Sequence, residues 1–244
     1  MSTEVSPEYY DVVGKFVDIL VGDPYFTAAS KGVYKYALQM NKDVKNEKPV
    51  YTLLKTYGRE KNMKSADNVR NMDYQALLAG SEGIGYFSIS DGMDFETSNQ
   101  RPLWENNSCD TWNGMVLWGT VEKKIIYDHF VFDKSPKFNQ DIDFDNPYWY
   151  YSWAVDGAVY MVVLGMVDGQ SLENVSIPLT STDGSVAIGS YTAEVIASKD
   201  MYGATNVPPV VITGQNNLNI TVNSVEATLY KITPSSAVDF SSLR

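Results

Sequence analysis

The chain has 244 residues, of which 44% are hydrophobic and 13% aromatic, a composition that suits a packed globule and excludes a disordered chain. The formal net charge is −11, and residues 141–244 hold 3 basic against 11 acidic side chains, which argues against nucleic acid and anionic membranes as partners. Cys109 is the single cysteine and His129 the single histidine, so an intramolecular disulfide and a multi-histidine metal site are excluded. We expect no metal and no cofactor.

Targeting signals are missing from the sequence. No run of about 18 apolar residues occurs, so no membrane-spanning helix is predicted. The first ten residues, MSTEVSPEYY, have neither the basic region nor the apolar region of a signal peptide. The sequence therefore assigns no compartment; a secreted or cell-surface location would follow if the chain had lost a longer N-terminus.

The first part of the chain alternates short apolar runs with longer amphipathic stretches. The predicted elements, in chain order, are a strand over 16–25, a helix over about 27–42, a strand over 48–58, a helix over 65–80, a strand over 80–91 and a helix over 111–132. Ser65 and Gly80 suit the two caps of the helix over 65–80. Its apolar stripe is formed by Val69, Met72, Ala76 and Leu77. Strands that alternate with helices predict a parallel sheet with right-handed crossovers.

Glycines cluster at the start of the third strand, in GSEGIGYFSISD. A phosphate-binding loop needs its glycines after a strand and before a helix, and here they follow a helix and precede a strand. The phosphate interpretation therefore fails. We expect Gly83 and Gly85 to let strand and helix pack closely.

Polar residues gather where the three strands end, which is the edge at which parallel sheets bind ligands. Asp23 and Asp91 are the candidate catalytic carboxyl pair, with backbones roughly 10 Å apart if they lie two strands from each other. Asp23 equally suits a cap of the next helix, and Asp91 a turn. The candidate sugar-binding residues are Tyr25, Lys55, Tyr57, Ser90 and Trp104.

The second part of the chain changes character. The polar stretch 136–147 is expected to be a linker. Two apolar runs around Asp156-Gly157 predict a β-hairpin over 149–166. Further strands are predicted over about 173–179, 185–197, 209–213, 217–223 and 225–232, with turns at Asp168-Gly169 and Asp183-Gly184, a spacing typical of a β-sandwich. For the aromatic run YWYYSW (148–153), the alternatives are a sugar-binding platform and a buried role, either in core packing or at an interface with the α/β half.

Three motifs give the chain a resemblance to glycoside hydrolases with a (β/α)8 barrel. VGDPYFTAAS closes a strand with Asp-Pro-Tyr, EKPVYTLLKTYG opens the next with Lys-Pro-Val, and a helix with YQALLAG runs into GIGYFSISD. These motifs resemble strands six to eight of such barrels, although they single out no numbered family. The resemblance implies an α/β fold followed by an all-β one: a partial (β/α)8 barrel of about three βα units over 1–135, and an accessory β-sandwich over 148–244.

The resemblance also implies what the chain would do and what it would lack. Glycoside hydrolysis normally needs two carboxyl groups, which retaining barrels carry on strands four and seven. Strand four is missing, and the strand-seven counterpart ends with Lys55 in LLKTYG. We therefore expect the C-terminal portion of a protein that acts on or binds carbohydrate and is not catalytically complete alone.

Two alternatives stay open. The first is a non-catalytic carbohydrate-binding or structural module. The second is one half of a split enzyme. In that case a partner chain or an upstream segment would supply the missing strands and enable O-glycosyl hydrolysis.

Overall fold

A computed structural model describes residues 14–24, 28–45, 47–55, 66–87, 136–198 and 210–243. The chain divides into two compact units, Met1–Val116 and Leu117–Arg244. The domain boundaries expected at residues 135 and 148 stay predictions. The helix expected over 111–132 and the cap expected at Ser65 lie outside the described residues.

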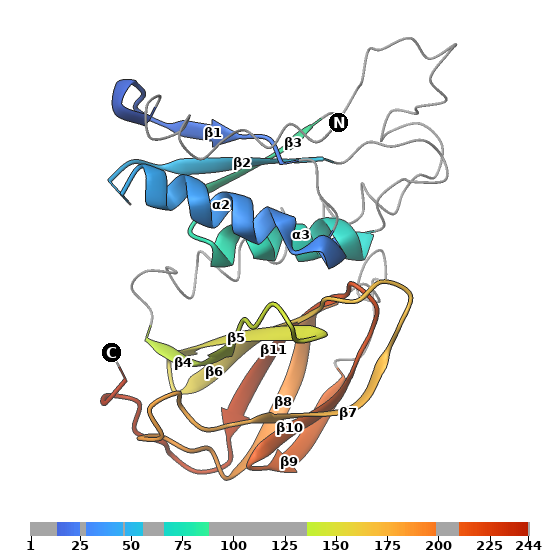
Figure 1. The fold of residues 1–244 in the computed structure, drawn as a ribbon. Helices are drawn as coiled ribbons and strands as arrows, with labels where there is room; N and C mark the ends of the chain where they lie inside the picture. The colour runs from blue at the N-terminus through green and yellow to red at the C-terminus, as the bar shows by residue number, and fades with distance from the viewer. Residues whose placement is uncertain are drawn as a thin grey trace. The chain divides into compact units, whose positions relative to one another are not determined.

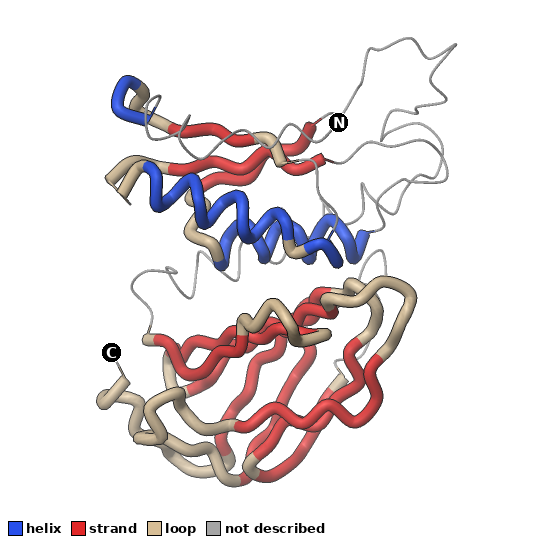
Figure 2. The backbone as a smooth tube through the Cα atoms, viewed as in Figure 1, coloured by secondary structure: helices blue, strands red, loops and turns tan. Residues whose placement is uncertain are grey.

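The first unit is an α/β layer in which helices alternate with strands, as the sequence predicts (Figure 1). Its described elements are η1 (Gly14–Phe16), β1 (Leu20–Gly22), η2 (Ala28–Ser30), α2 (Gly32–Asp43), β2 (Val50–Lys55), α3 (Ala66–Leu78) and β3 (Gly83–Phe87). The three strands form a parallel sheet in the order β1-β2-β3. Both helices lie on the same face of that sheet (Figures 1 and 2).

The face of the sheet toward the helices is apolar and buried. Leu20 and Val50, which are paired in register, pack with Ala37 and Met40 of α2. Gly22 allows this close approach, because a Cβ there would overlap the Met40 sulfur. The helix side of the sheet therefore forms a small core of its own.

The end of α3 confirms one predicted cap. Gly80 has φ 93°, and its N–H donates to the carbonyl of Leu77 at 2.9 Å. The N–H of Ser81 donates to the carbonyl of Ala76 at 3.0 Å, which completes a Schellman motif. The amide Nδ2 of Asn41 donates to the Ala79 carbonyl at 2.9 Å and so ties α2 to this turn.

Gly83 and Gly85 serve a purpose other than the predicted one. They lie in register with Tyr51 and Leu53 of β2, and a Cβ at Gly83 would come within 2.7 Å of the Tyr51 ring. Tyr51 is 40% exposed and lies on the face away from the helices. The glycines therefore make room for side chains of the neighbouring strand, and the expectation that they bring strand and helix together is wrong.

The second unit is a β-sandwich (Figures 1 and 2). Its strands are β4 (Lys137–Asp141), β5 (Tyr148–Val155), β6 (Ala158–Gly165), β7 (Leu172–Pro178), β8 (Ser190–Ala197), β9 (Val211–Gln215), β10 (Asn217–Val222) and β11 (Ala227–Pro234). One sheet has six strands in the order β4-β5-β6-β11-β8-β9, and the other pairs β10 with β7. The core between them includes Val159, Ile177 and Ile188, all fully buried.

The predicted hairpin is confirmed. Asp156 and Gly157 both have positive φ, 51° and 78°, and they join β5 to β6 with Val155 paired to Ala158. A two-residue turn of this kind matches the twist of an antiparallel pair, which is why an Asp-Gly sequence signals it.

The linker expected over 136–147 contains a strand instead. Lys137–Asp141 forms β4, which pairs with β5. This polar strand is held by specific bonds: the Ser152 hydroxyl donates to the Asn139 carbonyl at 2.9 Å, and the Asn139 side-chain amide donates to the Pro178 carbonyl. Only Phe138 points an apolar side chain into the core, so the stretch lacks the alternation that signals a strand.

Candidate functional site

The candidate site lies at the carboxyl ends of the parallel strands in the α/β unit. Asp23 follows β1 directly, and Lys55 is the last residue of the neighbouring β2. Gly22 is paired with Thr52, so Asp23 comes level with Leu53, and Lys55 lies one strand over and two residues further. Their backbones are thus about 8 Å apart. The structure brings these two predicted residues to one edge of the sheet.

Asp23 has an unusual environment for a carboxylate. Its Oδ1 atom is buried and has no hydrogen-bond partner among the described residues. A buried polar atom without a partner costs free energy, so native structures keep few of them, and those few concentrate where function needs them. This feature favours a functional role for Asp23 over the alternative role of a helix cap.

The remaining predicted site residues lie outside the described part of the chain. They are Tyr25, Tyr57, Ser90, Asp91 and Trp104. The pairing of Asp23 with Asp91 and the sugar-stacking roles of the aromatic residues therefore stay predictions.

Polar side chains buried on α3 were not expected from the sequence. The predicted apolar stripe is buried, but Arg70, Asn71, Asp73 and Gln75 are also fully buried. The Tyr86 hydroxyl donates to Asp73 at 3.0 Å, and Gln75 bridges to the Tyr34 N–H of α2 at 3.4 Å. These bonds link α3 to β3 and to α2, so the polar residues hold the layer together.

The aromatic run YWYYSW does not form an exposed platform. Trp149, Tyr150, Tyr151 and Trp153 are all buried. The indole N–H of Trp149 donates to the Asp143 carbonyl at 2.6 Å, and its ring meets Phe144 edge-on at 5.2 Å. Of the two interpretations, buried packing is therefore confirmed for these four residues.

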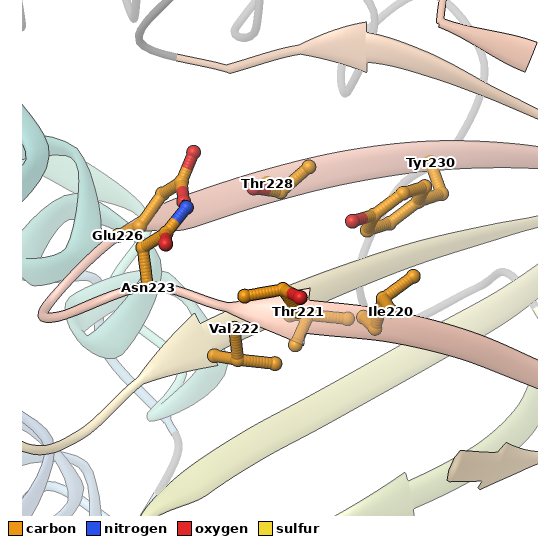
Figure 3. A pocket seen from close by; sticks show the side chains of 8 residues that line it. Ile220, Thr221, Val222, Asn223, Glu226, Thr228 and Tyr230 are labelled. Carbon is orange, nitrogen blue, oxygen red and sulfur yellow. The ribbon is translucent and has the colours of Figure 1, made fainter. Parts of the chain in front are cut away.

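A cleft beside β10 and β11 carries a buried carboxylate but no room for a ligand (Figure 3). The Asn223 amide donates to Glu226 across the turn between the strands. Burial, followed by the charge of Glu226, raises the pKa of Tyr230. The volume open to a water molecule is about 0 Å³, so these groups stabilise the turn and form no binding site.

Two further properties concern only the described ranges. Within them, no three Asp, Glu, His or Cys residues are grouped so that they could hold a metal ion. None of the described helices combines the length and apolar character needed to span a membrane.

Comparisons with known proteins find similarity to solved structures only. No known protein-family model matches the sequence, and no curated protein does. A GH30 endoxylanase from Clostridium papyrosolvens is 11% identical with a TM-score of 0.48, over 91% of this chain and 50% of that one. A monomeric β-xylosidase from Caulobacter crescentus is 12% identical with a TM-score of 0.49, over 94% of this chain and 59% of that one.

An α-L-arabinofuranosidase from Thermotoga maritima is 6% identical with a TM-score of 0.46, over 93% of this chain and 56% of that one. The chain thus spans between 50% and 59% of the length of these three enzymes. The structural neighbours are glycoside hydrolases. With TM-scores below 0.5, the likeness carries neither their fold nor their activity over to this chain.

Proposed function

We propose that this chain is the C-terminal portion of a glycoside-hydrolase-like protein that acts on or binds carbohydrate. In this proposal the α/β unit contributes about three βα units to a (β/α)8 barrel. The sandwich is its accessory domain, and the chain is not catalytically complete alone.

One observation carries the proposal: successive strands are neighbours, and both connecting helices cover the same face (Figure 1). Successive units of a (β/α)8 barrel all place their helices outside the sheet, which is the arrangement seen here. One half of a doubly wound sheet has the same arrangement, so the sequence motifs must separate the two folds. The other face would then be the barrel interior. On it, Val21 and Tyr51 are 49% and 40% exposed, as expected for interior side chains that lack the rest of a barrel.

The sequence motifs supply the chemical class. VGDPYF, KPVYTLLKTYG and YQALLAG resemble the last strands of glycosidase barrels. Asp23 is the candidate catalytic residue, because its carboxylate follows a strand and keeps one oxygen buried with no hydrogen-bond partner in the part of the chain that the structure describes. Asp91 remains its proposed companion, with Lys55 as a candidate substrate contact.

Non-catalytic carbohydrate binding is the second candidate function. Hydrolysis normally needs two carboxyl groups. Of the two predicted carboxyl groups, Asp23 lies among the described residues and Asp91 lies outside them. In a split enzyme, the second carboxylate would come from a partner chain.

The test compares the 244-residue chain with the protein found in its native cells. If the chain is a portion of a longer one, the protein from native cells should have an intact mass above 27.2 kDa under denaturing conditions. On a panel of aryl glycosides, we expect hydrolysis by the longer protein and none by the chain alone. Hydrolysis by the chain alone would contradict the proposal. If neither protein cleaves any substrate but one binds sugar, the second candidate function replaces it.

The matched variants are Asp23→Asn and Asp18→Asn in the longer protein. Asp18 is exposed and precedes β1, at the opposite end of the strand from Asp23. Loss of a general acid or base lowers kcat by about 10²–10⁴-fold, which we expect for Asp23→Asn only. An unchanged kcat in Asp23→Asn would remove Asp23 from the site.

A further inference from the structure

A pocket lined by hydroxyl groups opens in the sandwich unit, outside the site described above. It lies between β4, the loop after β7 and the C-terminal segment, and has a volume of about 400 Å³. Pockets for small ligands occupy about 300–1,000 Å³. Phe138 and Leu243, both buried, give it an apolar floor, and the N–H of Thr182 donates to the Phe138 carbonyl at 2.8 Å.

Asp183 is the most rigidly held polar group that lines this pocket. Its Oδ1 accepts three hydrogen bonds, from the Ser181 hydroxyl at 2.7 Å, the Ser185 hydroxyl at 2.8 Å and the Ser185 N–H at 3.0 Å. All three go to the same oxygen, which leaves Oδ2 as an acceptor on an exposed side chain. These bonds, that of Ser181 first, lower the pKa of Asp183 to about 2, so the group is ionised at neutral pH.

The other polar residues that line the pocket are one lysine and several uncharged residues. Lys137 lies with its Nζ 5.5 Å from the centre of the Tyr151 ring, which helps to fix its long side chain. Gln140, Thr182 and Ser242 add an amide and two hydroxyls, all exposed. Asp183 and Lys137 are the two charged residues among those that line the pocket. A phosphate would be repelled by Asp183, and a single carboxylate is too few ligands for a metal ion.

With phosphate and a metal ion excluded, the ligand class that fits the pocket is a neutral polyhydroxylated molecule. A sugar presents hydroxyls that both donate and accept, which suits a fixed carboxylate together with an amide and hydroxyls. Its C–H faces suit an apolar floor. We infer that this pocket binds a neutral saccharide of one or two residues and does not cleave it. The pocket alone carries this inference, which holds whether or not the α/β unit belongs to a hydrolase.

The experiment follows backbone amide signals of the labelled full chain by NMR. The probes are glucose, xylose, arabinose, cellobiose and xylobiose at millimolar concentrations. We expect at least one of them to shift the amides of Thr182, Asp183 and Leu243, with a Kd of about 1 mM because the site is open. If none of the sugars shifts these amides, or if phosphate shifts them and no sugar does, the inference is wrong.

Two variants test the assigned contacts. Asp183→Asn keeps an Oδ1 acceptor for the serines and replaces the free acceptor by a donor, so the Kd should rise about 10-fold. Gln140→Ala removes another lining group and should raise the Kd several-fold. The control is Asp239→Asn: Asp239 accepts the Ser241 N–H at 2.9 Å but does not line the pocket.

The control variant should bind like the unmodified chain. A thermal melt of each variant separates loss of contact from loss of fold. If Asp183→Asn and Gln140→Ala melt normally and bind normally, the pocket is not the saccharide site.

Discussion

The sheets of the two units differ in two respects: how many of their strands are paired on both sides, and how far their faces are buried. In the sandwich, β5 and β6 are buried along almost their whole length, and each has a strand on either side. In the α/β unit, β1 and β3 each pair only with β2 among the described strands. One face of that sheet is buried, whereas the other leaves Val21 and Tyr51 exposed.

This difference concerns the strand edges and sheet faces that each unit leaves open. A sheet buried on both faces gains apolar burial from every side chain, and its central strands expose no unpaired backbone groups. A parallel sheet is normally covered on both faces, and an open edge invites another strand. The central strands of the sandwich therefore have their backbone groups paired on both sides, while the described part of the α/β sheet has two open edges and one open face.

The largest expected effect is in the sandwich core. Ile177 of β7 is fully buried between the two sheets. Ile177→Ala removes this packing and should lower the free energy of unfolding by about 2–5 kcal/mol. A urea titration that is monitored by hydrogen exchange in peptides of the sandwich measures this loss of free energy. A loss below about 1 kcal/mol would show that the sandwich core is loosely packed.

A pair of glycines compares the two units directly. A Cβ at Gly165 would overlap the backbone carbonyl of Asn223, whereas one at Gly22 would meet the flexible end of Met40. Overpacking costs about 1–3 kcal/mol, so we expect Gly165→Ala near the top of that range and Gly22→Ala near the bottom. Denaturant titrations of both variants test the order, and equal losses would contradict it.

The open face of the α/β sheet should tolerate change. Val21 is 49% exposed, so Val21→Ala should alter the free energy of unfolding by no more than about 0.5 kcal/mol in this chain. Leu20→Ala is the matched control, because the neighbouring residue is 4% exposed and should cost about 2–5 kcal/mol. In a longer protein with a closed barrel, Val21→Ala should become costly. A large loss in the chain alone would mean that this face is already covered.

The smallest effect is on acid stability. Hydrogen bonds from Ser181 and then Ser185 lower the pKa of Asp183 from 3.8 to about 2 in the folded chain. A depressed pKa stabilises the fold above the unfolded value, and this contribution is lost as pH falls from about 4 through about 2. Asp183→Asn should flatten that part of the pH profile of the melting temperature. An unchanged profile would show that the three bonds do not persist in solution.

The sequence predicted the elements with strong periodicity or special turns. The helix over 65–80, the Gly80 cap and the Asp156-Gly157 hairpin follow from local rules, and all three are found with shifts of a few residues at their ends. Strand β4 was missed because bonds from Ser152 and to Pro178, distant in sequence, hold its polar residues. Such bonds leave no local pattern.

The candidate site could be predicted only in part. Parallel pairing places Asp23 and Lys55 at one edge, and this follows from strand order alone. The sandwich pocket was missed because Asp183-Gly184 was taken only as a turn. The available signal was the spacing of Ser181, Asp183 and Ser185, which lets two serines bind one carboxylate oxygen. Ser181 and Asp183 line a pocket only because β4 and residues 242–243 fold against them, and that contact cannot be predicted from the local sequence.

The position of β11 has a consequence for how the protein is made. The strand nearest the C-terminus lies in the middle of the six-stranded sheet, between β6 and β8. The β5–β6 hairpin and the β8–β9 pair can form early during translation, but they cannot join until residues 227–234 have left the ribosome. A stop codon before Ala227 would therefore split the sheet into two separate halves, each with a newly exposed edge.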